Sequence, residues 1–101
     1  MAVSNYVLSN KAKKDLEEIF YYISEELVNP ESASKLLMDI ESKFQAITKF
    51  PNAYSIISES RIDKENLRKC KVRNYLIIYV VNELEDRIEI VRVIYQRLNI
   101  L

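Results

Sequence analysis

The sequence predicts an α+β fold in which a short strand and two helices precede an antiparallel β-sheet. Two segments in the first half carry apolar residues at helical spacing. Two later runs of β-branched and aromatic residues, Tyr75–Val81 and Ile88–Tyr95, are joined by the acidic turn Asn82–Asp86. Strand-forming runs that a short polar turn separates are typical of a β-hairpin. Directly before this hairpin lies a cluster of four cations: Arg68, Lys69, Lys71 and Arg73.

The first elements expected along the chain are a strand over Asn5–Leu8 and a helix from about Lys11 to Leu27. Ser9 or Asn10 can cap this helix by accepting a hydrogen bond from a backbone N–H. The apolar side chains of the helix recur at helical spacing and form one face: Ala12, Leu16, Ile19, Phe20, Ile23 and Leu27.

The tripeptide Asn29-Pro30-Glu31 marks the start of a second helix. Asn29 can cap it, Pro30 suits a first turn that needs no N–H partner, and Glu31 complements the helix dipole. Pro51 ends the pattern, because the residue before a proline disfavours helical geometry. Together the two helices predict an antiparallel helical hairpin. The apolar face of the second helix is formed by Ala33, Leu36, Leu37, Ile40, Phe44 and Ile47.

After the helices we expect an irregular crossing loop over Asn52–Asn66 and strands over Lys69–Val72, Tyr75–Val81 and Arg87–Tyr95. Both sides of the middle strand are apolar, which predicts a central strand covered on both faces. The helices can cover one face, and we expect a partner chain to cover much of the other. The two sides alternate along the strand: Tyr75, Ile77, Tyr79 and Val81 on one, Leu76, Ile78 and Val80 on the other.

The composition is that of one soluble domain over residues 1–101. The chain has 101 residues, of which 49% are hydrophobic and 30% charged, enough for one modest core. No apolar run reaches the roughly 20 residues of a membrane span, and the first residues lack the pattern of a signal peptide. We therefore expect a cytoplasmic protein that does not enter a membrane.

Several kinds of site are excluded by the residues that the chain lacks. There is no histidine and only one cysteine, so a His-based triad, the usual zinc site and an internal disulfide are ruled out. Without glycine the chain cannot build a Walker loop or a Rossmann fingerprint. We therefore expect no metal and no cofactor. Cys70 has no basic partner of the histidine type, so we do not expect it to act as a nucleophile.

The formal net charge is zero, but the charge is unevenly placed. Residues 61–75 contain six cations and two anions, whereas residues 1–60 contain six cations and nine anions. A basic patch on a neutral protein predicts an anionic partner at one face. The alternative is a solvated strand whose lysines deter aggregation.

At this point the chain resembles a known family over essentially its whole length. After the opening strand, the segments KAKKDLEEIFYYI, NPESASKLLMDIESKF, AITKFPNAY, LRKCKVRNYLIIYVV and IEIVRVIYQR follow in the order and spacing of the RelE/ParE superfamily. These are the toxins of bacterial type II toxin–antitoxin systems. The resemblance implies a single toxin domain, with a helical hairpin packed on a twisted, mainly antiparallel sheet. It also implies a cognate antitoxin, a toxin–antitoxin hetero-oligomer and a role in plasmid stabilisation and growth inhibition.

The superfamily has two main activities. RelE-like members cut mRNA on the ribosome without metal, and ParE-like members inhibit DNA gyrase without being nucleases. RelE-like nucleases typically carry an arginine where this chain has Leu76. An alkyl group cannot neutralise a phosphorane, a loss of several kcal/mol of transition-state stabilisation. The isoelectric point near 6.3 is also low for a ribosome-binding nuclease. The resemblance therefore favours gyrase inhibition. The alternatives left open are a ribosome-dependent endoribonuclease and a degenerate member that only binds its antitoxin.

The resemblance and the charge pattern together select the candidate site residues. Arg92 interrupts an apolar run, so it faces a cleft or pairs with Glu89 or another carboxylate; we favour the cleft. Tyr75 and Tyr79 are expected in the core. The candidates for binding are Arg68, Lys69, Lys71, Arg73, Tyr95 and Arg97, and the candidates for catalysis, if the chain is a nuclease, are Arg68, Arg73, Arg92 and Arg97.

Overall fold

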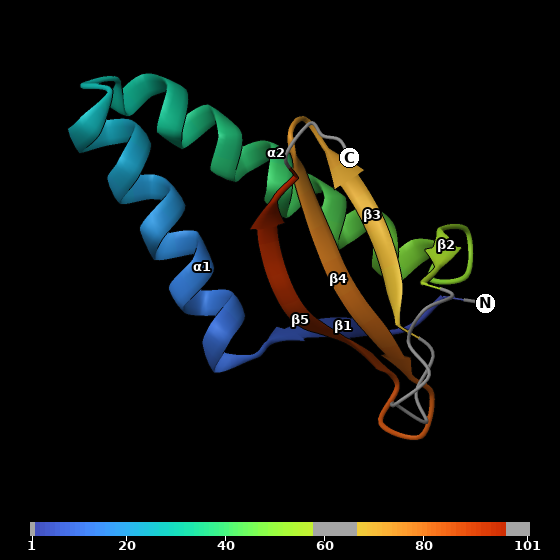
Figure 1. Ribbon diagram of the computed structural model, residues 1–101. Helices are drawn as coiled ribbons and strands as arrows, with labels where there is room; N and C mark the ends of the chain where they lie inside the picture. The colour runs from blue at the N-terminus through green and yellow to red at the C-terminus, as the bar shows by residue number, and fades with distance from the viewer. Residues whose placement is uncertain (1, 58–66, 97–101) are drawn as a thin grey trace.

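The computed structural model describes residues 2–57 and 67–96 and confirms the α+β fold: two helices packed on a five-stranded mixed sheet (Figure 1). The strand order is β1-β5-β4-β3-β2. The elements in chain order are β1 (Asn5–Leu8), α1 (Asn10–Tyr21), the π-helical turn η1 (Tyr22–Glu26), α2 (Pro30–Lys49), β2 (Ser55–Ile56), β3 (Arg68–Val72), β4 (Tyr75–Asn82) and β5 (Arg87–Tyr95).

The sheet is antiparallel except at one side, where β1 pairs parallel with the first half of β5. The prediction of an irregular loop over Asn52–Asn66 was wrong in one respect: the segment contains the short strand β2, which pairs with the start of β3. Two residues are too few to give a strand pattern in the sequence. Residues 58–66 of that loop lie outside the described part of the chain.

Both helices begin at the predicted caps. Ser9 caps α1, because its hydroxyl accepts a hydrogen bond from the backbone N–H of Ala12 at 2.9 Å. The amide oxygen of Asn29 accepts from the N–H of Ser32 at 3.2 Å and caps α2, which has Pro30 in its first turn. Each cap satisfies a backbone donor that the first turn of a helix leaves free.

The first helix ends differently from its prediction. We expected one regular helix as far as Leu27, but α1 changes at Tyr22 into η1, where the N–H of Leu27 bonds to the carbonyl of Tyr22. The wider turn is followed by Val28 in a left-handed conformation, with φ of 50°. The side chains of Tyr22 to Glu26 give no sign of this in the sequence, since π-helical and α-helical turns accept the same residues.

The core lies between the helices and one face of the sheet. α2 crosses behind the sheet and α1 lies beside β5 (Figure 1). The predicted alternation along β4 is confirmed on this covered face, where Ile77 and Tyr79 are fully buried. The Tyr79 hydroxyl donates to the carbonyl of Pro51 at 2.8 Å, so its polar end is satisfied. Phe20 and Leu27 belong to the predicted apolar face of α1, yet both are exposed, since they lie toward the tip of the helical hairpin.

A β-bulge in β5 decides where Arg92 points. Ile78 pairs with Arg92 and the next residue, Tyr79, pairs with Ile90, so Val91 is the extra residue. Without the bulge, alternation from Ile88 and Ile90 would direct Arg92 into the apolar core. The bulge shifts the alternation by one residue, so Val93 is buried and Arg92 stays partly exposed.

Beyond the end of β1, the backbone groups at the edge of β5 form hydrogen bonds with side chains at the start of α1. The Ser9 hydroxyl donates to the carbonyl of Val91 at 2.7 Å, and the carboxylate of Asp15 accepts from the N–H of Val93 at 2.9 Å. Backbone groups that could otherwise pair with another strand are therefore occupied.

Among the described helices, none is long and apolar enough to cross a membrane.

Candidate binding surfaces

The four clustered cations do not form one patch. Strand alternation sends Lys69 and Lys71 to the face of the sheet that no described helix covers, and both are exposed. We call this the open face. Arg68 points the other way, together with the buried Cys70. The basic cluster of the sequence is thus divided between two sides of β3.

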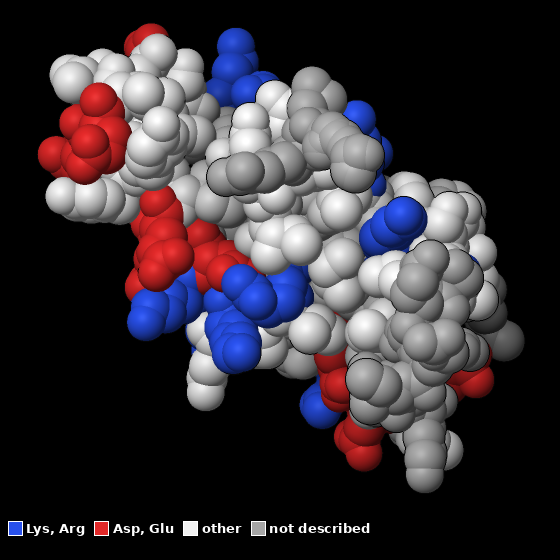
Figure 2. Space-filling view, viewed as in Figure 1, with Lys and Arg blue, Asp and Glu red and all other residues white. Residues whose placement is uncertain are grey.

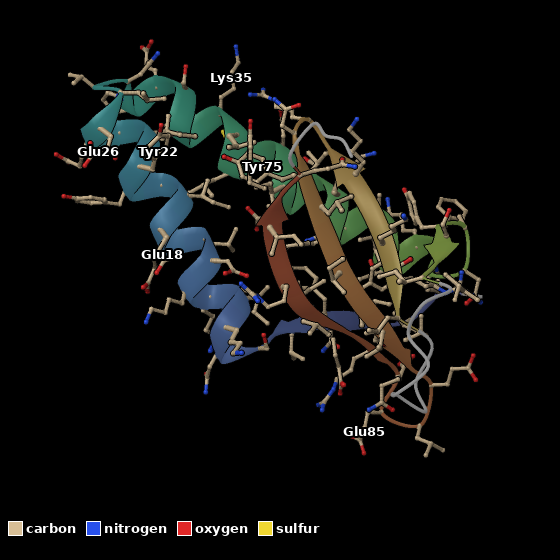
Figure 3. All side chains as sticks on the ribbon, in the orientation of Figure 1. Glu18, Tyr22, Glu26, Lys35, Tyr75 and Glu85 are labelled. Carbon is tan, nitrogen blue, oxygen red and sulfur yellow. The ribbon has the colours of Figure 1, made fainter. Side chains whose placement is uncertain are left out.

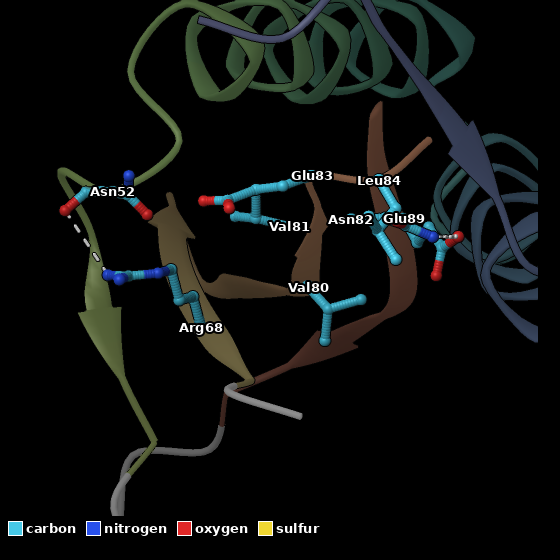
Figure 4. Close-up of a pocket in the computed structure, with 8 residues that line it drawn as sticks. All are labelled: Asn52, Arg68, Val80, Val81, Asn82, Glu83, Leu84 and Glu89. Atoms are coloured by element: carbon cyan, nitrogen blue, oxygen red, sulfur yellow. Dashed lines mark hydrogen bonds between the residues drawn. The ribbon is translucent and has the colours of Figure 1, made fainter. Parts of the chain in front are cut away.

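Arg68 is held by the backbone of the segment between α2 and β2. Its guanidinium donates to the carbonyls of Asn52 and Tyr54. It lines a pocket of about 550 Å³ at the C-terminal end of β4, shown in Figure 4. The described lining contains two carboxylates, Glu83 and Glu89, against this one cation. The balance of charge in the described lining is therefore unfavourable for a phosphate group.

Arg73 lies at the other end of β3, in the turn before β4. Its backbone is left-handed, with φ of 53°, and its side chain forms a salt bridge with Asp39 of α2. Both side chains are nearly half exposed, so this pair contributes little to stability. It does keep the guanidinium beside α2.

The sequence predicts that Arg92 either faces a cleft or pairs with a carboxylate. In the structure it does both. Its guanidinium donates to the two oxygens of Asp15 at 2.8 and 3.0 Å, a fork-like arrangement. Burial raises the pKa of Asp15, but hydrogen bonds from Arg92 and from the Val93 N–H outweigh it and hold this pKa below its usual value. The partner is Asp15 of α1 and not Glu89, which bonds to Asn82 and Arg87.

The open face presents an apolar strip with cations along one side. Leu76, Ile78 and Ile94 are partly exposed there, and Leu76 lies directly between Lys71 and Ile94 in the sheet register. Lys69 is paired with Ile78. A strip of this kind suits a partner segment that is apolar in the middle and acidic at its margin.

A second surface lies between the tip of the helical hairpin and the ends of β4 and β5. It is a cleft of about 770 Å³, which we call the tyrosine cleft. The rings of Tyr75 and Tyr95 meet edge to face with centroids 5.4 Å apart. Figure 3 labels Tyr22 and Tyr75, which both line it. Its apolar lining is formed by Ile19, Tyr22, Ile23, Leu27, Tyr75, Val93, Ile94 and Tyr95.

The structure places the remaining candidates as follows. Tyr95 is exposed in the tyrosine cleft, and Tyr75 is only partly buried there, whereas Tyr79 is in the core. Cys70 is buried, and burial raises the pKa of its thiol. Arg97 lies outside the described residues. Within residues 2–57 and 67–96 no three metal-ligating side chains come together.

Sequence reasoning missed Asp15 and the cleft itself. Asp15 lies 77 residues before Arg92, and nothing in the local pattern connects the two. Tyr22 is exposed, as expected for a tyrosine on the surface of a helix, but its position over the end of β4 depends on how the hairpin packs. A cluster of tyrosines at element ends is the one signal that could have indicated the cleft.

Ten chains of solved structures match this chain, among them the following two. "Chromosomal ParDE TA system from P. aeruginosa" has a TM-score of 0.74 at 20% sequence identity, with 94% of this chain and 97% of that chain covered. "Crystal structure of metal-bound toxin from Helicobacter pylori" has a TM-score of 0.53 at 19% identity, with 92% and 93% covered. At such identities the likeness shows the fold alone. No curated protein matches the sequence.

The sequence itself matches a family over residues 6–99, a range that begins in β1 and includes both helices and every later strand. That family is described as the ParE toxin of the type II toxin–antitoxin system parDE. This agrees with Leu76 on the open face and with the ParE-like branch that the sequence favoured. The chain belongs to the ParE toxin family of type II toxin–antitoxin systems.

Proposed function

We propose that this chain is a toxin that inhibits DNA gyrase and that a cognate antitoxin neutralises it by binding the open face. The observation that carries the proposal is the state of the arginines that a nuclease would need. Arg68, Arg73 and Arg92 each bind a partner within the chain, and they do not converge on one point. The family and the fold support the toxin class, and the arginines favour gyrase over mRNA.

The chemistry of RNA cleavage explains why these contacts matter. A ribonuclease without metal must place cations where negative charge develops on the phosphorane. Arg68 and Arg73 lie at opposite ends of β3, and Arg92 lies against α1. At the position on β4 where a RelE-like nuclease has its arginine, the open face has Leu76. The described arginines therefore offer no set of converging, unengaged cations.

The open face supports the antitoxin part of the proposal. Leu76, Ile78 and Ile94 give a partner apolar area to bury, and Lys69 and Lys71 attract an acidic segment. Burial supplies most of the affinity in such an interface, while the charges raise the association rate and its salt dependence. An acidic, amphipathic segment is the expected occupant.

The test measures the effect of the purified chain on two candidate targets, DNA gyrase and translated mRNA. We expect it to inhibit supercoiling by DNA gyrase, and we expect primer extension on a translated message to show no codon-positioned cleavage. The antitoxin, encoded by an adjacent reading frame, should restore supercoiling. Lys69→Glu with Lys71→Glu should raise the antitoxin concentration required, most strongly at low salt. Lys13→Glu with Lys14→Glu makes the same charge change on α1 and is the control.

Two outcomes would overturn the proposal. Codon-positioned cleavage with supercoiling untouched would assign the chain to the nuclease branch and return Arg68, Arg73, Arg92 and Arg97 to candidacy. No response in either assay, with the antitoxin still bound, would identify a degenerate member that only binds its antitoxin.

A further inference from the structure

The tyrosine cleft leaves large apolar side chains in contact with solvent. Tyr22, Leu27 and Tyr95 are 55%, 56% and 60% exposed, although all three line the same cleft. Soluble monomers seldom leave contiguous apolar patches exposed without a role in binding. Tyrosine in particular is enriched among the residues that dominate protein interfaces, because its ring is apolar and its hydroxyl can stay hydrated.

The backbone beside the cleft is irregular at two neighbouring points of one helix end. Tyr22 and Ile23 reach the cleft from η1, and π-helical turns occur often at functional sites. Val28, two residues after η1, has φ of 50°. A β-branched residue in this region is a genuine outlier, and such strain is found mainly at binding and switch regions. Both features belong to the turn that ends the first helix, since the N–H of Asn29 bonds to the carbonyl of Ile23 across Val28. Together they set where Tyr22 and Ile23 lie beside the cleft.

The charges around the cleft define its occupant. Glu18 lines it, and Glu25 and Glu26 are exposed on η1. Figure 2 shows acidic side chains over the tip of the helical hairpin and along α1, with basic side chains next to those along α1, and Figure 3 labels Glu18 and Glu26 there. Asp15 is already paired with Arg92. Because Arg92 and Asp15 neutralise each other, Glu18 gives the described lining a net negative charge, the opposite of Lys69 and Lys71 on the open face.

We propose that this toxin binds its target protein through the tyrosine cleft, and that the target presents an apolar side chain flanked by lysine or arginine. The negatively charged lining attracts such a surface and disfavours the acidic segment expected of the antitoxin. Target and antitoxin then occupy adjacent surfaces, which meet at Ile94. The inference rests on the proposed toxin function and deepens it by assigning the target-binding site.

The experiment uses the full chain and three readouts: growth arrest after induction, inhibition of gyrase supercoiling, and affinity for the antitoxin encoded by the adjacent reading frame. Tyr22→Ala with Leu27→Ser should weaken growth arrest and gyrase inhibition by at least about tenfold, as expected for residues at the centre of an interface. Antitoxin affinity should stay within about twofold, because surface substitutions outside an interface change little.

Matched controls separate the cleft from general exposure. Tyr21→Ala with Met38→Ser replaces two side chains that are exposed to 60% and 67% but do not line the cleft, and it should arrest growth like the wild type. Glu26→Lys should weaken growth arrest, whereas the same change at Glu85, at the opposite end of the molecule, should not (Figure 3). Thermal melts of every variant confirm that it is folded.

Each possible result decides the inference. Full growth arrest by the cleft variant overturns it, and so does a parallel loss of antitoxin affinity, which would place the antitoxin in the cleft. Growth arrest that depends on the cleft without gyrase inhibition supports the inference and removes only the gyrase assignment. A wild-type chain that arrests no growth removes both the proposed function and this inference.

Discussion

Where α2 crosses the sheet, apolar side chains are fully enclosed, whereas at the tip of the helical hairpin side chains of the same kinds are more than half exposed. Ile40, Ile77 and Ile88 have no accessible surface, while Leu27 is 56% and Val28 78% exposed. The tip also has a π-helical turn and a valine with positive φ, next to the capped start of α2. Stability therefore resides mainly in the enclosed core, whereas the apolar side chains at the tip remain exposed and accessible to a partner.

The largest expected effect contrasts one residue from each region. Ile88→Ala should lower the free energy of unfolding by about 2–5 kcal/mol, because it leaves a cavity in a closed core. Leu27→Ala removes a similar side chain at the tip and should change it by less than about 0.5 kcal/mol. Urea denaturation followed by circular dichroism measures both. Equal losses would mean that the tip is part of the folding core, and the comparison would fail.

A medium effect is expected at the contact that joins α1 to the sheet. Asp15 accepts hydrogen bonds from Arg92 and from the Val93 N–H, and its side chain is only 12% exposed. Asp15→Asn should lower the free energy of unfolding by about 1–2 kcal/mol, because hydrogen bonds to a charged acceptor are stronger than those to a neutral one. Asp39→Asn, in the half-exposed pair with Arg73, is the control and should change little.

The same substitution has a pH signature with a defined sign. The pKa of Asp15 is lower in the folded chain than its ordinary 3.8. Its contribution to stability is therefore fully present above pH 3.8 and is lost as the pH falls through the lower folded-state pKa. The difference between the wild type and Asp15→Asn should shrink over that acidic range. A difference that is constant with pH would show that the carboxylate charge is not what stabilises the contact.

The smallest expected effect is a gain in the free energy of unfolding rather than a loss. Val28→Gly should raise the free energy of unfolding by about 0.5–1 kcal/mol, because glycine adopts a positive φ without the steric cost that valine incurs. The midpoint of urea denaturation should move upward accordingly. A lower midpoint would mean that Val28 makes contacts that outweigh its backbone strain, and that the tip is better optimised for stability than we infer.

The regular parts of the fold could be predicted from the sequence because their signals are local. The caps Ser9 and Asn29 and the alternation along β4 each depend on neighbours in the chain. The bulge at Val91 was also within reach, since simple alternation would have buried Arg92. β2 was missed because two residues carry no pattern.

The candidate surfaces were less predictable, because they depend on contacts between distant residues. The four clustered cations were treated as one patch, although alternation already separates Arg68 from Lys69 and Lys71. The pairing of Arg92 with Asp15 has no local signal at all. The tyrosine cleft requires the tip of α1 to lie over the ends of β4 and β5, which only the packed structure reveals.

The parallel pairing of β1 with β5 has a consequence for the order in which the toxin is made. Ser9, directly after β1, bonds to Val91 in β5, 82 residues later. The helical hairpin can form while the chain is still growing, but β1 has no partner until β5 has been synthesised. Such distant contacts delay folding, because a long loop must close before they form. A chain that is still being translated therefore cannot complete its sheet, and the fold closes only after synthesis has passed β5.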